Sequence, residues 1–149
     1  MTVKIEKDIE QIRQSAEAMD AAKPERIGSP SIGDCIRQGD VFLVCLPALL
    51  DGRPAQSTQL APGDSQGSRH IMTGECVVVE VADKNKLREA IKKATGAAVP
   101  VELIGPMVQC KGESTLTHPQ HGHKILPEGT TWAVTYQRAY GEEVRRVLD

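Results

Sequence analysis

The chain of 149 residues has few aromatic side chains: one Phe, one Trp and two Tyr. Proteins that bind single-stranded nucleic acid stack bases on aromatic rings and attract the phosphates with a basic surface. The formal net charge of this chain is −2, which provides no such attraction. The composition therefore argues against nucleic acid as a partner.

Long apolar runs are also missing. No run approaches the length of a membrane span, and the N-terminus has no apolar core of a signal peptide. The four cysteines lie far apart and form no C-x-x-C pair, so the sequence indicates no disulfide framework. We expect a soluble, cytoplasmic protein without a membrane partner.

The first segment has the periodicity of an amphipathic helix, which we predict from Val3 to Ala22. Its apolar residues recur every three or four positions: Ile5, Ile9, Ile12, Ala16 and Met19. Two interpretations remain open. The helix docks on its own domain, or it pairs with a second copy of the chain or a partner protein.

From Gly39 the pattern changes to strands. The apolar, β-branched runs Val41–Leu46 and Cys76–Val81 predict two buried strands, and 99–110 contains further strand material. Between them, a helix is predicted from a cap at Asp83 or Asn85 through Lys93, with Gly96 at its end.

Near the C-terminus, apolar and polar residues alternate from Thr130 to Arg138, as in a strand with one buried face. The preceding Pro127-Glu128-Gly129 predicts a tight turn that pairs this strand with 123–126 as a hairpin. A short terminal helix is predicted over 142–148.

These elements predict the α+β class. We expect a helix and linker in residues 1–32, followed by a single β-rich domain in residues 33–149. Its short strands would be mostly antiparallel, and helices would stand at the N-terminus, in mid-chain and at the C-terminus.

The histidines are the strongest functional signal. All four lie in two short polar stretches: His70, His118, His121 and His123. Imidazoles are the commonest ligands of zinc and other divalent transition metals, which makes these four the candidate metal ligands and such a metal the candidate cofactor. Glu75 is the candidate general base. H-x-x-H-x-H matches no established zinc signature, so the alternative is a set of turn histidines that hydrogen-bond the loop.

Four further residues are candidates for ligand or partner contacts. Ser68 and Arg69 precede His70 and could hold a phosphate or carboxylate. Arg138 and Tyr140 follow the last strand, and Arg and Tyr are enriched in protein interfaces.

The region from Gly39 to the end resembles a group of small uncharacterised bacterial proteins. The resemblance rests on five short segments: Gly39-Asp40, Ser68-Arg69-His70, His118-Pro119-Gln120-His121, Leu126-Pro127-Glu128-Gly129 and Gln137-Arg138-Ala139-Tyr140. It covers none of the N-terminal helix and implies no particular activity.

The first functional hypothesis is a small accessory or binding module with a histidine-lined polar crevice that holds a divalent metal. The second is a metal-dependent hydrolase that uses the same histidines. The third is a structural subunit of a larger assembly, with the N-terminal helix and the 136–140 edge as contacts. No recognisable catalytic set accompanies the histidines, which favours binding over catalysis.

Overall fold

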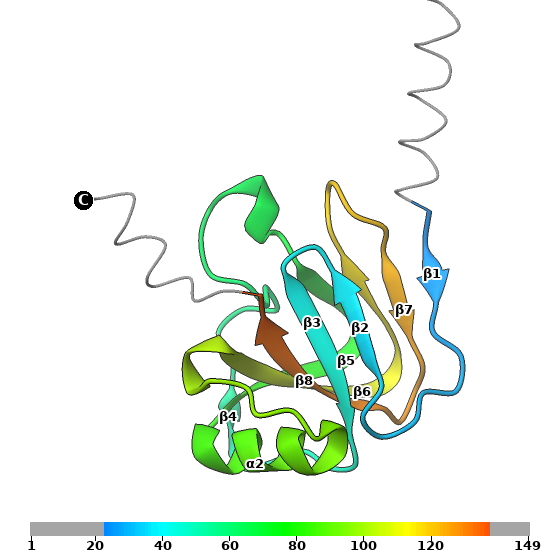
Figure 1. Ribbon diagram of the computed structural model, residues 1–149. Coiled ribbons are helices and arrows are strands. Elements are labelled where there is room, and N and C mark those ends of the chain that lie inside the picture. The colour runs from blue at the N-terminus through cyan, green and yellow to red at the C-terminus, as the bar shows by residue number, and fades with distance from the viewer. Residues whose placement is uncertain (1–22, 138–149) are drawn as a thin grey trace, which may run out of the picture.

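The computed structural model describes residues 23–137 (Figure 1). One sheet curls into a half-barrel with the strand order β1-β7-β6-β8-β3-β2, and β5 and then β4 extend it from the other edge of β6. The elements are β1 (Glu25–Arg26), β2 (Cys35–Gln38), β3 (Val41–Leu46), β4 (Gly52–Pro54), η1 (Gln66–Ser68), β5 (Ile71–Val81), α2 (Lys84–Thr95), η2 (Val101–Leu103), β6 (Ile104–Thr117), β7 (Lys124–Leu126) and β8 (Thr131–Tyr136).

The predicted α+β class is wrong. Strands account for 43% of the described residues and helical segments for 16%, and α2 is the single α-helix within residues 23–137. The predicted N-terminal and C-terminal helices lie outside the described residues. The strand content was underestimated because β5 and β6 run on into polar sequence, where apolar periodicity is weak.

The centre of the sheet is a long hairpin whose loop is the segment 118–123. β6 leads into this loop, and β7 and β8 follow it and run back antiparallel along one edge of β6. Both pair with β6 in a single register, with Ser114 opposite Leu126 and Gln109 opposite Thr131. The predicted hairpin between β7 and β8 is therefore wrong. The segment 127–130 interrupts a returning strand, and the sheet forks there, because β1 joins β7 while β3 joins β8.

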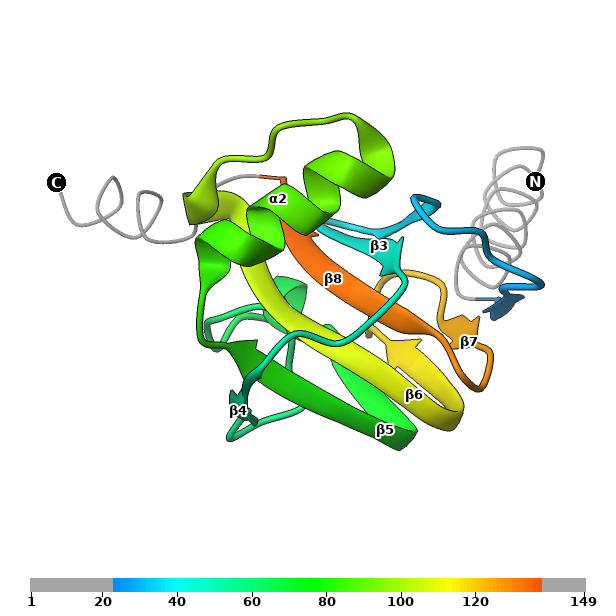
Figure 2. The same cartoon turned by 90° about the horizontal axis from the view of Figure 1, so that it is seen from below.

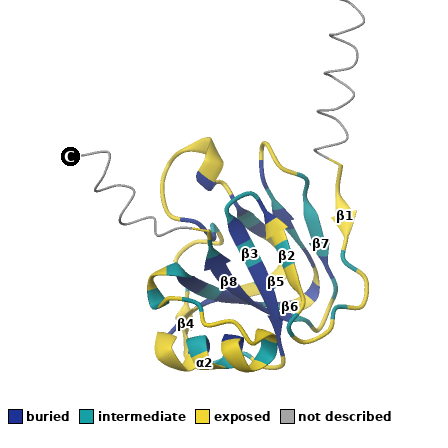
Figure 3. Ribbon diagram, viewed as in Figure 1, coloured by how far each residue is buried: buried dark blue, intermediate teal, exposed yellow. Residues whose placement is uncertain are grey.

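The sheet buries apolar side chains on both faces, because inward and outward positions alternate along each strand. Trp132 and Val134 of β8 lie in the inner core of the half-barrel with Leu43 and Val108. Ala133 points to the outer face. Figure 3 shows the resulting burial of the central strands β3 and β8.

Helix α2 covers the outer face (Figure 2). The Asp83 side chain accepts the Lys86 N–H at 3.1 Å, and Gly96 ends the helix in the left-handed conformation. Leu87 and Ile91 are fully buried against the sheet, and each contributes roughly 1.5–3 kcal/mol of burial free energy. The predicted mid-chain helix is confirmed. No helix in residues 23–137 is long and apolar enough to cross a membrane.

Candidate functional site

Three of the four histidines meet at the loop end of the central hairpin. His70 immediately precedes β5, and His118 immediately follows β6. Because Ile71 pairs with Thr117 in antiparallel strands, both histidines emerge at the same end of the sheet. The ring centroid of His118 lies 4.3 Å from that of His70 and 4.5 Å from that of His121. We call these three residues the histidine cluster.

Both ring nitrogens of His118 are used in hydrogen bonds. Its Nδ1 accepts the backbone N–H groups of Gln120 and His121, at 3.0 and 3.2 Å. Its Nε2 lies 3.1 Å from the Gly67 carbonyl oxygen. An accepting Nδ1 carries no proton, so His118 is a neutral imidazole that donates from Nε2 to Gly67. It thereby holds the 118–123 loop against the loop that contains η1.

Gln38, at the end of β2, fixes the orientation of His70. The buried Gln38 side chain donates from Nε2 to the carbonyls of Leu116 and Gly122, at 2.9 and 3.0 Å. This leaves Oε1 as the acceptor, and it lies 2.8 Å from His70 Nδ1. Nδ1 of His70 therefore carries the proton, and Nε2 carries a lone pair.

The surroundings keep His70 neutral. Its pKa is lowered from the usual 6.5 to about 4, mainly by burial and also by the neighbouring imidazoles of His118 and His121, which together outweigh the opposite effects of Asp40 and the Gly67 carbonyl. Burial also lowers the pKa of His118, and the hydrogen bond to Gly67 offsets this only in part.

The Nε2 atom of His70 has no hydrogen-bond partner. Within residues 23–137 it is the only fully buried side-chain nitrogen or oxygen in that state. Leaving such a group unpaired costs about 1–3 kcal/mol. In a native structure such an unpaired atom calls for an explanation, for example a catalytic role or a bound ion.

A pocket of about 320 Å³ opens beside the histidine cluster, in the fork between β2 and β7. We call it the fork pocket. Its lining residues are Arg37, Gln38, Gly39, His121, Gly122 and Lys124. Gly39 has a φ of +58°, and a Cβ at this position would lie 2.7 Å from His121 Nε2. Glycine is thus required here both by its backbone conformation and by the imidazole packed against it.

The remaining sequence candidates lie elsewhere. His123 is half-buried, and its backbone carbonyl accepts the Glu25 N–H, but its ring is outside the cluster. Glu75 is exposed at the bulge of β5 and packs against Gly112, away from the histidines.

Of the two candidates beside His70, Ser68 ends η1 and Arg69 follows it. Ser68 is buried with its hydroxyl 3.1 Å from that of Ser65, and Arg69 is exposed. Arg138 and Tyr140 lie outside the described residues.

Sequence reasoning missed Gln38, Arg37 and Lys124. For Gln38 the sequence carries only a weak signal, a polar residue at the end of the short strand β2, directly before Gly39-Asp40. Its role was not predictable, because both carbonyls that it binds lie more than seventy positions away in the chain.

The geometry does not fit the predicted metal site. Zinc takes at least three protein ligands, and His118 has no free lone pair while one nitrogen of His70 is committed to Gln38. Within residues 23–137, no group of three or more His, Cys, Asp or Glu side chains is arranged to hold a metal ion. Metal binding stays a prediction without geometric support.

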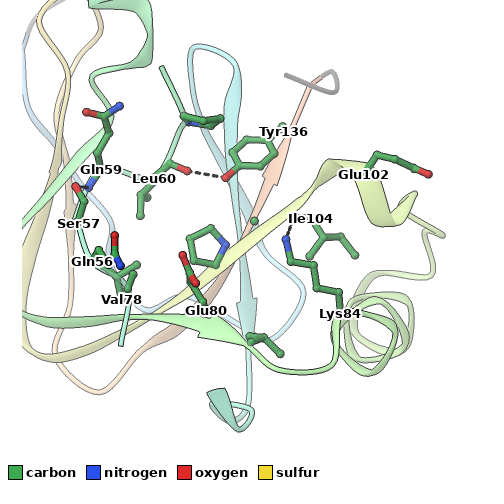
Figure 4. Close-up of a pocket in the computed structure, with 15 residues that line it drawn as sticks. Gln56, Ser57, Gln59, Leu60, Val78, Glu80, Lys84, Glu102, Ile104 and Tyr136 are labelled. Atoms are coloured by element: carbon green, nitrogen blue, oxygen red, sulfur yellow. Dashed lines mark hydrogen bonds between the residues drawn. The ribbon is translucent and has the colours of Figure 1, made fainter. Parts of the chain in front are cut away.

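A larger cleft of about 670 Å³ lies where β5 and β6 splay apart, at Gly105 and Pro106 (Figure 4). Its walls combine apolar side chains such as Val78 and Ile104 with polar ones such as Gln56 and Glu102, and several of its polar groups hydrogen-bond the backbone. The Tyr136 hydroxyl donates to the Leu60 carbonyl at 2.6 Å, and Lys84 donates to the Ile104 carbonyl at 2.9 Å. The fork pocket has the stronger signs of a binding role.

Comparison of the chain with protein-family models, with curated proteins and with solved structures gives no match. The resemblance to a group of small bacterial proteins therefore stays a resemblance.

Proposed function

We propose that the protein is a binding module that recognises an anionic group, a carboxylate or a phosphate, in the fork pocket. One observation carries the proposal. Three side chains that are cationic or can be protonated, Arg37, His121 and Lys124, line this small pocket, and the described part of its lining contains no carboxylate. Such a lining favours an anion that can accept several hydrogen bonds.

Arg37 is held in place and still has donors to offer. It donates from Nε to the Gly39 carbonyl and from Nη2 to Gln137 Oε1, at 2.8 and 3.1 Å, and its guanidinium lies over the Phe42 ring. A guanidinium has five N–H donors, so three remain for a ligand. Lys124 pairs with Glu25 through one of its three donors.

The histidine cluster and Gln38 stabilise the loop that forms one wall of this pocket. His118 orders the loop that presents His121, and Gln38 joins the loop to β2. A pocket whose walls are fixed before binding loses less conformational entropy when the ligand enters. The proposal thus keeps the predicted polar crevice lined by histidine, but its ligand is an anion and not a metal ion.

The test is a titration of the full-length protein with inorganic phosphate and, separately, with acetate, followed by the NMR signals of the His121 imidazole. We expect saturable shifts with at least one of the two anions, and the stronger binder identifies the class. Arg37→Gln should weaken binding roughly 10- to 100-fold, because a hydrogen bond to a charged group contributes about 1.5–3 kcal/mol.

Arg53→Gln is the matched control, because Arg53 is an exposed arginine on β4, outside the fork pocket, that pairs with Glu80. It should bind like the wild type. Absence of saturable binding with both anions would contradict the proposal, and so would equal losses in the Arg37 and Arg53 variants.

The two other hypotheses gain no support from the described residues. A metal-dependent hydrolase needs ligands that the cluster does not provide, and its candidate base Glu75 lies away from the histidines. The structural-subunit hypothesis depends mainly on segments outside residues 23–137.

A further inference from the structure

Cys76 of β5 and Cys110 of β6 are directly opposite each other. They are the first pair after the bulge that separates Gly74 from Cys76 in the strand register. Both side chains are on the inner face of the half-barrel, since Cys110 belongs to the inner core and Cys76 packs against it. Two thiols therefore share one face of two neighbouring strands.

The backbone hydrogen bonds of Cys110 identify the type of pair. Its N–H donates to the Thr130 carbonyl at 2.9 Å, and its carbonyl accepts the Gly129 N–H at 2.8 Å. Both groups thus point away from β5, and the cysteines form a non-hydrogen-bonded pair. Opposite Cα atoms in such pairs are about 4.5 Å apart. Disulfides span Cα separations of roughly 4.4–6.8 Å.

The two thiols also influence each other's titration, because a negative charge on Cys76 raises the pKa of Cys110 in addition to the effect of burial. Burial raises the pKa of both thiols, so the thiolate forms of both are scarce and their reactions are slow. Cys76 is half-buried, whereas Cys110 is inaccessible, which makes Cys76 the point of entry for a reagent.

We infer that Cys76 and Cys110 form a cross-strand disulfide when the protein meets a small-molecule disulfide oxidant such as oxidised glutathione. The Cys76 thiolate attacks one sulfur of the oxidant, forms a mixed disulfide and releases one molecule of glutathione. The Cys110 thiolate then attacks the Cys76 sulfur and releases the second. Two electrons and two protons pass from the protein to the oxidant.

The crosslink would join the two strands that carry the histidine cluster, because β5 begins after His70 and β6 ends before His118. This inference does not depend on the proposed anion binding. It assigns an oxidation site in the sheet.

The test treats folded Cys35→Ser protein with oxidised glutathione and measures its intact mass. Cys35 is removed because it is exposed and would add glutathione by itself. We expect the loss of two hydrogen atoms, reversed by dithiothreitol. Each cysteine falls in a different tryptic peptide, so a crosslink between peptides 70–84 and 94–111 identifies the pair.

Two variants in the same background complete the test. Cys45→Ala should keep the crosslink, and Cys76→Ala should lose it. A crosslink that includes Cys45, or folded protein that acquires no crosslink under prolonged oxidation, would overturn the inference. Peptide mapping of the Cys35→Ser protein decides the question even if the other variants fold poorly.

Discussion

Lowering the pH from about 7 to 4 should destabilise the fold, and His70 should account for much of the loss. Its pKa is about 4 in the folded protein against 6.5 for an ordinary histidine. Between these values the unfolded chain binds a proton that the native state excludes. The free energy of unfolding therefore decreases as the pH falls through 6.5 and stops responding to this group below about 4.

The size of the effect follows from the shift. Each pKa unit corresponds to 1.36 kcal/mol, so His70 contributes about 3 kcal/mol of stability at neutral pH that is absent near pH 4. This shift already includes the groups that face His70. Positive charge on His118 and His121 acts in the same direction as burial, and the Asp40 charge and the Gly67 carbonyl act against it.

His70→Asn isolates the contribution. The asparagine amide can still donate to Gln38 in place of Nδ1, but it does not titrate. Urea unfolding is followed through the fluorescence of Trp132, the single tryptophan, which is buried in the core. The stability difference between wild type and variant should change by about 3 kcal/mol between pH 7 and pH 4.

Two results would refute this reasoning. One is a His70→Asn variant whose stability depends on pH as strongly as that of the wild type. The other is an NMR titration in which the His70 imidazole of the folded protein takes up its proton near the ordinary value of 6.5. Comparing wild type with variant removes the acid titration of the carboxylates, because they are common to both.

Three further predictions concern the support of the site and the sheet. Gln38→Leu should lower the free energy of unfolding, measured in urea, by about 2–4 kcal/mol, because the carbonyls of Leu116 and Gly122 and the His70 N–H lose their partner. A loss below about 1 kcal/mol would contradict this hydrogen-bond network. Gly39→Ala should cost about 1–3 kcal/mol, because Gly39 has a positive φ and His121 leaves no room for a Cβ atom. Gly28→Ala, with open space around it, should be nearly neutral, and equal effects of the two substitutions would refute the packing at Gly39. Leu87→Ala should lower stability by about 2–5 kcal/mol, and a near-neutral result would mean that α2 does not depend on this contact with the sheet.

Much of the local structure was predictable. The strand Val41–Leu46 was predicted at the bounds that β3 has, because a short β-branched run between turn residues is a strong local signal. The mid-chain helix was equally clear, because its cap, its apolar face and its terminal glycine all lie within one segment. In β6 the signal was weak, since the inward positions Gly112 and Ser114 are small or polar.

The prediction of a hairpin at Pro127–Gly129 failed for a different reason. Proline and glycine indicate an irregular backbone, but they do not say whether the chain reverses there. Here β7 before the segment and β8 after it both pair with β6 in the same register. Only this pairing shows that the chain continues in the same direction through 127–130. The reversal occurs at 118–123, the segment singled out for its histidines.

The sequence by itself determined the local elements and the concentration of the histidines in two loops, because both are properties of neighbouring residues. Only the tertiary structure decided which histidines meet, since the pairing of β5 with β6 brings His70 to His118 and leaves the His123 ring outside the cluster. It also decided their chemistry. The protonation state of an imidazole depends on its burial and its hydrogen-bond partners, and for His70 the decisive partner is Gln38, more than thirty positions away.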